Sequence, residues 1–407
     1  MPRACFFSLP LHGHVNPSLP LVRALADRGI DVIYYAADPF ASAIEEAGGR
    51  FRRYRSEFLR DIRNLPDRMH EVAWLLMRSA GEVLEHELPE IRAGSFDVVI
   101  TDSVAPWGHW VGEKLDLPVV TSVPTFAFNR HVLAYGVARG VRPKSAGMLL
   151  SKLRYITKAA LLQRRLRRRF DARGPGLMKT LMGHSDLNIV YTSRLFQPCI
   201  ETFDERYEFV GPSFGPRIEA SRFPWERVRG DFAYVSLGTL FNTDPAFYKH
   251  CFDAFRDAPF QVVMSIGGTV ALSALGPVPA NLIVQPYVPQ LEVLARASAF
   301  VSHGGMNSVS ESLAHAVPLV VIPQMGEQAI VARRVQELGA GLMLTPPEVS
   351  GSRLRAAVDG LLSDPGFRTQ AAVIRESFRA AGGVDRATEA ITTFVHWWRS
   401  KEALHHT

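Results

Sequence analysis

Short apolar runs alternate with helical patterns along the whole chain, and this alternation limits the folds available to it. Ala4 to Leu9 and Asp31 to Ala36 are runs of strand length, separated by a helical pattern from Leu19 to Asp27. The alternation continues through Phe40 to Ala47, Asp97 to Thr101, Val119 to Ser122 and Leu187 to Thr192. Strands that alternate with helices are typical of parallel sheets with helices on both faces. The sequence therefore predicts an α/β protein.

A dense cluster of breakers interrupts this pattern near the middle of the chain. The cluster consists of Gly211, Pro212, Gly215, Pro216, Pro224 and Gly230. Because neither a helix nor a strand tolerates so many Gly and Pro residues, the segment is predicted to be a linker. A second series of apolar runs follows at Phe232 to Leu237, Gln261 to Ile266, Leu282 to Val284, Ala299 to Ser302 and Pro318 to Ile322.

The length of the chain fits two domains, since 407 residues exceed the usual size of one hydrophobic core. We predict a first domain over 1–211, a linker over 212–230, a second domain over 231–384, and a helix over 385–407 that crosses back onto the first domain. Two-domain proteins commonly bind small ligands in a cleft between the domains.

The positive charge is concentrated in one segment. The chain has a formal charge of +6. Residues 152–173 hold nine Lys and Arg residues against one acid, Asp171, so this segment contributes +8 and the rest of the chain sums to −2. Proteins that coat nucleic acid usually spread basic residues over a face, so a nucleic-acid partner is not expected. The stretch from 148 to 173 is either a solvated helix face, a contact with an anionic membrane, or a binding surface for a lipid-like or acidic acceptor.

Three isolated cysteines, Cys5, Cys199 and Cys251, form no CxxC pair and favour a reducing compartment. The first apolar run ends at Leu11 without a small-residue cleavage site, so it is interpreted as a strand and not as a signal peptide. No run reaches the roughly 18 to 20 apolar residues that span a bilayer. The predicted location is the cytoplasm.

Several familiar signatures are absent from the sequence. There is no GxGxxG, no Walker lysine loop, no GxSxG elbow and no HExxH. No two aspartates stand two positions apart, so the DxD pattern that often holds a divalent ion under a nucleotide diphosphate is also missing. We therefore predict neither a metal site nor a cofactor.

His14 and Asp102 are the candidate acid–base residues. His14 lies at the junction between the first predicted strand and the first predicted helix, with Pro17 expected in the first helical turn. The positive end of a helix disfavours an imidazolium, which keeps a histidine able to accept a proton. Asp102 follows the run from Asp97 to Thr101, at the same carboxyl edge of the predicted sheet, where it can orient the imidazole. The alternative is that each residue only caps a helix.

The stretch from Phe300 to Glu311 is the strongest local signal. A strand ends in His303, Gly304 and Gly305 let the backbone approach a ligand, and a helix then begins at a polar turn. Free N–H groups at such a helix start suit phosphate oxygens without a metal. Glu311, one turn into the helix, can accept from sugar hydroxyls. The turn from Ser236 to Thr239 offers further phosphate donors, although each turn alone also fits a plain Gly-rich connection.

Over nearly its whole length, the chain resembles the family-one glycosyltransferases of the glycosyltransferase-B (GT-B) fold, and within them the bacterial macrolide glycosyltransferase group. The C-terminal block that carries the resemblance runs through Tyr287-Val288-Pro289-Gln290, His303-Gly304-Gly305-Met306-Asn307-Ser308, Glu311, Val317-Pro318, Pro323-Gln324 and Glu327-Gln328. The resemblance implies two Rossmann-like parallel-sheet domains that face each other across a cleft.

The resemblance also implies roles for single positions. Tyr287 matches the position that stacks on the nucleobase, the backbone of Val288 the one that pairs with the base, and Gln290 and Glu311 those that reach the ribose. The diphosphate-binding positions are matched by His303, Gly304, Gly305, Asn307 and Ser308, with Ser236, Gly238 and Thr239 opposite. Glu327 and Gln328 match the pair that holds sugar hydroxyls. His14 matches the catalytic base and Asp102 its partner.

Two positions depart from the family pattern and bear on the donor. The stacking residue is often Trp and here is Tyr287, while the sugar-binding acid is often Asp and here is Glu327. A carboxylate at Glu311 favours a ribose that keeps its 2′-hydroxyl, because a deoxyribose would leave it partly unpaired. UDP-glucose is therefore the first expected donor and a dTDP-sugar the second. The expected reaction is an inverting, metal-independent hexose transfer. Rival interpretations are a nucleotide-sugar epimerase and a non-catalytic binding protein.

The expected acceptor is an apolar molecule with a hydroxyl group, such as a macrolide, a polyketide or a phenol, with a lipid as an alternative. Aromatic and Met residues of the first domain are candidates for lining its pocket, although hydrophobic residues are more often part of a core. These candidates are Phe58, Trp74, Met77, Trp107, Phe126, Phe128 and Met148.

Overall fold

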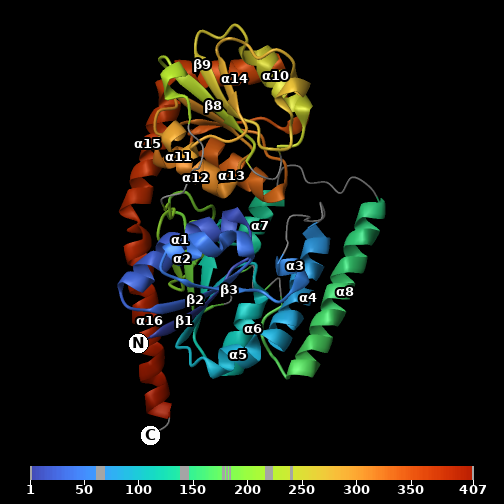
Figure 1. Ribbon diagram of the computed structural model, residues 1–407, viewed down its shortest axis with the longest axis vertical. Coiled ribbons are helices and arrows are strands. Elements are labelled where there is room, and N and C mark those ends of the chain that lie inside the picture. Colours follow the sequence, from blue (N-terminus) through green and yellow to red (C-terminus); the bar gives the residue numbers. More distant parts are fainter. Residues whose placement is uncertain are drawn as a thin grey trace. The chain divides into compact units, whose positions relative to one another are not determined.

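The computed structural model describes residues 2–60, 69–137, 146–176, 179, 182, 185–215, 223–238 and 242–405 (Figure 1). The chain forms two compact units, which we call unit 1, residues 1–215 with 381–407, and unit 2, residues 216–380. Thr239 lies outside the described residues, and of Met148 only the backbone is described.

Unit 1 is built on a seven-stranded sheet in the order β3-β2-β1-β4-β5-β6-β7, with every neighbouring pair parallel. The strands are β1 (Arg3–Phe7), β2 (Asp31–Ala36), β3 (Arg50–Arg53), β4 (Val98–Asp102), β5 (Val119–Val123), β6 (Leu187–Val190) and β7 (Tyr207–Phe209). The α-helices are α1 (His12–Asp27), α2 (Ala41–Glu46), α3 (Glu57–Arg60), α4 (Met69–His86), α5 (Leu88–Ala93), α6 (Pro106–Leu115), α7 (Arg130–Val137), α8 (Ala146–Phe170) and α16 (Gly383–His405).

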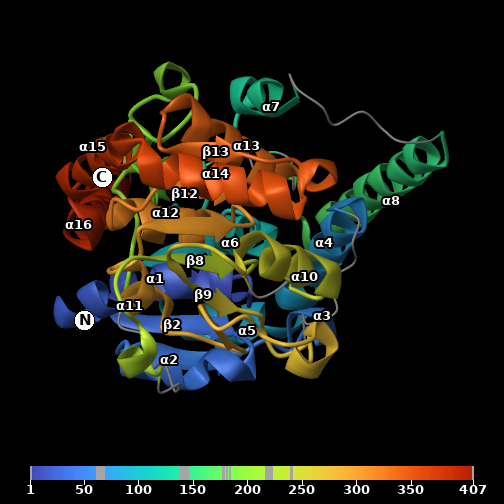
Figure 2. The same ribbon diagram turned by 90° about the horizontal axis from the view of Figure 1, so that it is seen from above.

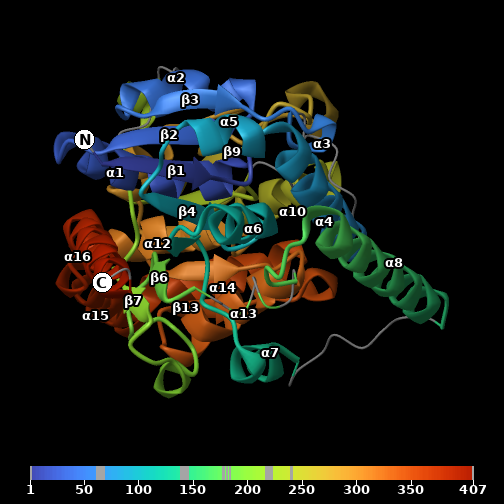
Figure 3. The same ribbon diagram turned by 90° about the horizontal axis from the view of Figure 1, so that it is seen from below.

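Alternate residues of each central strand of unit 1 enter different cores. Ala4 and Phe6 of β1 pack with α1, α2 and α16, while Cys5 and Phe7 pack with α4, α5, α6 and α8. Figure 3 shows these two groups of helices on opposite faces of the sheet. This period of two is the geometry of a strand buried on both faces, which explains the continuous apolar runs in the sequence.

Unit 2 contains a six-stranded parallel sheet in the order β10-β9-β8-β11-β12-β13. Its strands are β8 (Phe232–Ser236), β9 (Gln261–Ser265), β10 (Leu282–Gln285), β11 (Ala299–Ser302), β12 (Leu319–Val321) and β13 (Gly341–Met343). Its α-helices are α10 (Pro245–Phe255), α11 (Gln290–Leu294), α12 (Met306–Ala314), α13 (Gly326–Glu337), α14 (Gly351–Ser363) and α15 (Pro365–Ala380). Helices α10 and α14 cover one face through a shared core (Figure 1). Both units are Rossmann-like, which confirms the predicted fold class.

The first helix begins earlier than predicted. Leu11 is its N-cap, and the carbonyl of Leu11 accepts from the backbone N–H groups of His14 and Val15, both at 2.9 Å. His14 therefore lies inside the first turn. The prediction that Pro17 belongs to the first turn is wrong, because helical hydrogen bonding already starts at His12. None of the helices in the described ranges is long and apolar enough to cross a membrane.

Glu87 is a buried acid at the junction of α4 and α5. Its side chain is 1% exposed, and Oε1 accepts from the backbone N–H of Arg55 at 2.7 Å. Burial raises the pKa of this carboxyl to about 7, because a charged carboxylate is poorly solvated there.

This raised pKa predicts a pH-dependent stability. The folded state holds the Glu87 proton up to about pH 7, whereas the unfolded chain releases it near its ordinary pKa of about 4.3. The contribution of Glu87 to stability is therefore fully present at low pH and is lost as the pH rises through 7. In Glu87→Gln the decline in the free energy of unfolding between pH 5 and pH 8 should be smaller, by on the order of 1 to 2 kcal/mol. Denaturant titrations of both proteins at the two pH values measure this, and an equal decline in both would contradict it.

Candidate functional site

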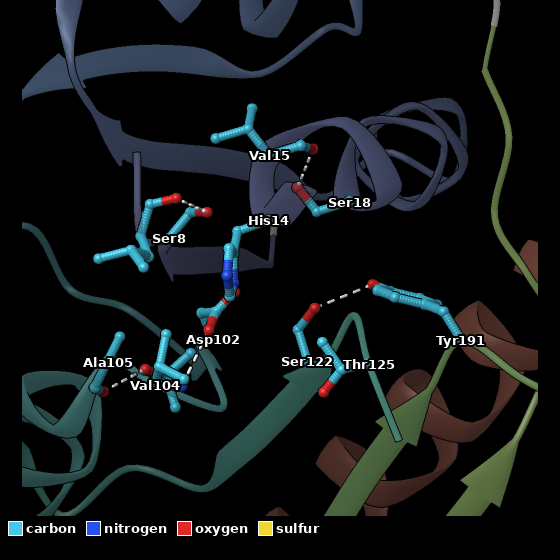
Figure 4. A network of polar contacts seen from close by, with 12 residues as sticks. Ser8, His14, Val15, Ser18, Asp102, Val104, Ala105, Ser122, Thr125 and Tyr191 are labelled. Carbon is cyan, nitrogen blue, oxygen red and sulfur yellow. Dashed lines mark hydrogen bonds and ion pairs between the residues drawn. The ribbon is translucent and has the colours of Figure 1, made fainter. Parts of the chain in front are cut away.

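His14 and Asp102 are in direct contact in unit 1. Strands β1 and β4 are neighbours and pair Phe7 with Thr101, so both strands end at the same edge of the sheet. Asp102 is the last residue of β4, and His14 lies in the first turn of the helix that follows β1. The His14 Nδ1 atom is 2.7 Å from Asp102 Oδ2 (Figure 4). The Asp102 side chain is 2% exposed and that of His14 is 17% exposed, so the imidazole remains reachable from solvent.

Neither residue is the N-cap of a helix. The N-cap of α1 is Leu11 and that of α6 is Ala105. The second carboxylate oxygen of Asp102, Oδ1, accepts from the backbone N–H of Val104 at 2.9 Å. Both oxygens of Asp102 are thus fixed, one by the turn that follows β4 and one by the imidazole.

This contact determines which nitrogen of His14 can act as a base. A carboxylate can only accept, so Nδ1 carries the proton in the neutral imidazole and Nε2 has the lone pair. When Nε2 takes a proton, the charge that develops is stabilised by Asp102. The positive end of α1 opposes that charge in the resting state. The pair has the geometry of a general base with an orienting carboxylate.

Buried hydroxyl groups surround this pair, and sequence reasoning did not identify them. Tyr34 and Ser18 share a hydrogen bond of 2.7 Å. Ser122, which pairs with Asp102 in the sheet, donates to the hydroxyl of Tyr191 at 3.0 Å (Figure 4). Burial raises the pKa of both tyrosines far above the ordinary value. They therefore stay neutral and do not compete with His14 as bases.

Three neighbouring strands of unit 2 end in the same way. Ser265 of β9, Ser236 of β8 and Ser302 of β11 stand side by side in register. Two residues after each serine is a glycine with positive φ, at 72° for Gly267, 73° for Gly238 and 87° for Gly304. Ser236 Oγ accepts from the N–H of Gly238, and Ser302 Oγ accepts from the N–H of Gly304, both at 3.2 Å. The strand ends thus form a row of tight turns, of which the one at Ser265 was not predicted.

The imidazole of His303 is enclosed by two of the predicted glycines. A Cβ atom at Gly238 would lie 2.5 Å from His303 Cε1, and one at Gly305 would lie 2.5 Å from His303 Nε2. Only glycine fits at either position. Burial lowers the pKa of His303 to about 4, so the ring is neutral at physiological pH. It can offer a phosphate a hydrogen-bond donor but not a resident positive charge.

Helix α12 begins at Met306, three residues after this histidine. Gly305 is its N-cap and has no side chain to cap the first turn, while Asn307 and Ser308 are half-buried in that turn. A helix start with uncapped backbone N–H groups suits an anion. The predicted residues His303, Gly304, Gly305, Asn307 and Ser308 are therefore together at one strand-to-helix junction, next to Ser236 and Gly238.

A chain of hydrogen bonds joins Gln290 and Glu311, the two predicted ribose contacts. Gln290 Nε2 donates to Glu311 Oε2 at 2.6 Å and to Ser308 Oγ at 3.3 Å. The hydroxyl of Tyr234 donates to Gln290 Oε1 at 3.1 Å. Because the carboxylate only accepts, it sets the orientation of the amide, and Tyr234 then holds the opposite end. Glu311 is 1% exposed, and Tyr234 was not predicted.

The other predicted donor residues differ in exposure. Tyr287 is 61% exposed, so its ring is available for stacking. Glu327 is exposed in the first turn of α13. Gln328, by contrast, is buried, and its Oε1 accepts from the backbone N–H of Gln324 at 2.8 Å. This hydrogen bond links Gln328 to the loop that precedes α13. Gln328 therefore stabilises that loop, a role that the sequence did not indicate.

The predicted acceptor pocket needs correction. Met77 and Trp107 are 1% and 0% exposed within the core that packs β1 against α4 and α6, and Phe126 is 0% exposed against Phe196. These three are core residues, because apolar side chains at such positions are buried by the layers of the fold itself. Phe58 and Phe128 pack partly buried against cores of unit 1, and the ring of half-buried Trp74 lies 5.6 Å from the Arg78 guanidinium.

Comparison with known proteins identifies the family. A family model described as "Erythromycin biosynthesis protein CIII-like, C-terminal domain" matches residues 252–385. The NDP-glycosyltransferase YjiC of Bacillus subtilis (strain 168) is 36% identical over 393 residues, which cover 95% of this chain and 96% of that protein. The chain belongs to the family-one glycosyltransferases of the GT-B fold, in the macrolide glycosyltransferase group.

Two further similarities agree with this family. The uncharacterized UDP-glucosyltransferase YojK of Bacillus subtilis (strain 168) is 34% identical over 97% of this chain and 98% of its own length. The crystal structure of CalG4, the calicheamicin glycosyltransferase, matches with a TM-score of 0.80 and 30% identity, covering 97% of this chain and 98% of that chain. The protein is thus an enzyme that transfers a glycosyl group.

Among the described residues, no three His, Cys, Asp or Glu side chains gather where they could hold a metal ion.

The His14–Asp102 contact predicts that glycosyl transfer is much slower when His14 is replaced. Replacing His14 with Ala should lower kcat for glycosyl transfer by roughly 100-fold or more, because the base that activates the acceptor hydroxyl is removed. His12→Ala is the matched control: His12 is an exposed histidine of the same turn, and its ring packs against Phe40 at 4.9 Å. Steady-state rates of both variants measure the effect. A near-normal rate for His14→Ala, or an equal loss in the control, would contradict the assignment.

Proposed function

We propose that this glycosyltransferase transfers a hexose, with glucose as the first choice, from a UDP-sugar to a hydroxyl group of an apolar natural-product acceptor in the cytoplasm. The observation that carries the proposal is the contact of His14 Nδ1 with Asp102 Oδ2, because it prepares Nε2 to accept a proton. The transfer inverts the anomeric configuration and needs no metal ion.

The chemistry follows from these residues. His14 Nε2 takes the proton of the acceptor hydroxyl while the acceptor oxygen attacks the anomeric carbon. The bond from that carbon to the diphosphate oxygen breaks, and UDP leaves from the opposite side, so one displacement inverts the configuration. The N–H groups at the start of α12 and the neutral His303 stabilise the charge on the departing diphosphate. Asp102 stabilises the imidazolium until the proton is released.

The choice of a UDP-sugar is supported by the hydrogen-bonded pair of Gln290 and Glu311. A buried carboxylate gains a donor from a ribose 2′-hydroxyl, and a deoxyribose would not supply it. The similarity to a protein named as a UDP-glucosyltransferase supports the same choice. The other relative is named only as an NDP-glycosyltransferase, so a dTDP-sugar is the alternative donor in the experiment below.

The choice of an apolar acceptor is supported by the comparisons. The matching family model is described by erythromycin biosynthesis, and the similar crystal structure is that of a calicheamicin glycosyltransferase. We propose macrolides, polyketides and phenols as the acceptor class, with hydroxylated lipids as a further group to test.

Product analysis by mass spectrometry tests donor, acceptor and metal requirement together. The purified protein is incubated with UDP-glucose or dTDP-glucose, a panel of macrolides, polyketides, phenols and hydroxylated lipids, and either a chelator or magnesium. We expect a hexose adduct with UDP-glucose that also forms in the chelator. Adducts with dTDP-glucose alone would overturn the donor assignment, and activity restored only by magnesium would overturn metal independence. Conversion of the sugar nucleotide without any acceptor would favour an epimerase, and UDP binding without turnover a binding protein.

The hydrogen bond from Tyr234 to Gln290 predicts that a variant of Tyr234 discriminates less well between UDP and 2′-deoxy-UDP. In Tyr234→Phe the Gln290 amide loses the donor that fixes its orientation, so its alignment with Glu311 is weakened. The preference for UDP over 2′-deoxy-UDP should fall roughly 10-fold, mainly through weaker UDP binding. The matched control is Tyr248→Phe, which removes a buried hydroxyl of unit 2 that donates to the carbonyl of Ile266 at 3.4 Å. Calorimetric titration of both nucleotides measures the ratio, and an unchanged preference in Tyr234→Phe would contradict the role.

A further inference from the structure

Helix α8 of unit 1 has one face packed and one face open. Leu162, Leu166 and Phe170 face the core that contains α4 and α6. The contact with α4 is close, because a Cβ atom at Gly81 would lie 2.6 Å from Leu166 Cδ2. Figures 1 and 2 both show α8 on the outer side of α4, at the margin of unit 1. The inward residues account for the attachment of the helix, which leaves its outer face without a role in the fold.

The outer face carries a straight row of four cationic residues with one leucine between them. The row, which we call the α8 stripe, consists of Arg154, Lys158, Leu161, Arg165 and Arg168, all exposed. Their spacing of four, three, four and three residues keeps them on one side of the helix. At a rise of about 1.5 Å per residue the stripe is about 21 Å long. Its centre is Leu161, which is 49% exposed.

The α8 stripe contains no acids. On several other helices cations are paired one turn away, as in Arg333–Glu337 at 2.7 Å, Arg355–Asp359 at 2.7 Å and Arg78–Glu82 at 3.1 Å. The sequence of α8 contains neither Asp nor Glu. Like charges four residues apart destabilise a helix. A solvated face gains nothing from this arrangement, so the charge favours a partner of opposite sign.

Two arginines of α8 are already engaged within unit 1 and are not part of the stripe. Arg169 pairs with Glu85 of α4 at 2.6 Å, and Arg167 donates to the carbonyl of Gly174 at 2.7 Å. These contacts hold the C-terminal end of α8. Within the described ranges, Arg154, Arg165 and Arg168 of the stripe make no ion pair with an acid, so their charge is available to a partner.

One exposed apolar residue lies among these cations, Leu161, which is 49% exposed. Ile156 is also exposed, at 52%, but at 3.6 residues per turn it stands on the opposite side of the helix from the stripe. Basic residues mixed with exposed aliphatic side chains are typical of helices that lie in the interface of an anionic bilayer, where cations meet the headgroups and aliphatic groups enter the acyl boundary. A phosphate backbone offers no place for an aliphatic group, and the stripe itself contains no aromatic side chain that could stack on bases.

We propose that the α8 stripe docks this enzyme onto an anionic lipid bilayer, with the helix lying in the plane of the surface. Charge complementarity selects the occupant, since a plane of anionic headgroups can meet all four cations of a straight stripe at once. The attachment is peripheral and reversible, and it depends on ionic strength because it is electrostatic. This inference does not rest on the proposed donor or acceptor.

Co-sedimentation with vesicles tests the docking. The full-length protein is mixed with vesicles of phosphatidylcholine alone, or with about a third of phosphatidylglycerol. We expect binding to the anionic vesicles only, with release at high salt. The variant R154Q/K158Q/R165Q/R168Q should bind at least about 20-fold more weakly, because each basic residue near an anionic surface contributes several-fold. Leu161→Gln should weaken binding by a smaller factor.

The control variant is R333Q/R353Q/R375Q/R379Q, which removes the same net charge from helices of unit 2 where each arginine pairs with an acid. It should bind vesicles like the unaltered protein. Both quadruple variants should retain their circular dichroism and their transferase rate with a water-soluble acceptor. No binding of the unaltered protein to anionic vesicles, an equal loss in the control, or binding to nucleic acid or an acidic polypeptide in place of vesicles would overturn the proposal.

Discussion

Parallel strand pairing in register is the constraint on which both groups of functional residues depend. In unit 1 this pairing places the ends of β1 and β4 at the same edge of the sheet. The helix after β1 therefore positions His14 next to the carboxylate of Asp102. In unit 2 the same pairing aligns three serines at the ends of β9, β8 and β11. All strands of a parallel sheet point the same way, so polar residues that are remote in sequence gather at one edge while the strands themselves stay apolar.

Burial at that edge then sets the protonation of the side chains. His303 is enclosed by glycines and stays neutral, so the diphosphate-binding residues act through hydrogen bonds and helix geometry, without a resident cation. Tyr34 and Tyr191 remain protonated for the same physical reason, which leaves His14 as the group able to accept a proton beside Asp102. The excess positive charge of the chain lies elsewhere, in residues 152–173, most of which belong to α8.

The sequence predicted the strands well because residues buried on both faces leave uninterrupted apolar runs, and β11 has the predicted limits. It also placed His14 between the first strand and the first helix, and Asp102 and His303 at strand ends, since a polar residue after an apolar run has few other locations. It did not identify Tyr234, whose hydroxyl acts from within a strand, or Ser265, whose neighbours in space come from β8. It assigned Met77, Trp107 and Phe126 to a pocket, although all three are buried. An apolar residue in a sequence fits a hydrophobic core and the wall of a pocket equally well.

The sequence by itself determined the α/β class, the family and the residue types at the strand ends, because these follow from local periodicity and from short ordered motifs. Only the tertiary structure decided which of these residues touch. The 2.7 Å contact of His14 with Asp102 joins residues 88 positions apart, and the orientation of Gln290 depends on Tyr234 and Glu311 from two other elements. Hydrogen bonds and desolvation depend on distances between separate segments, and those distances exist only after the sheets have formed.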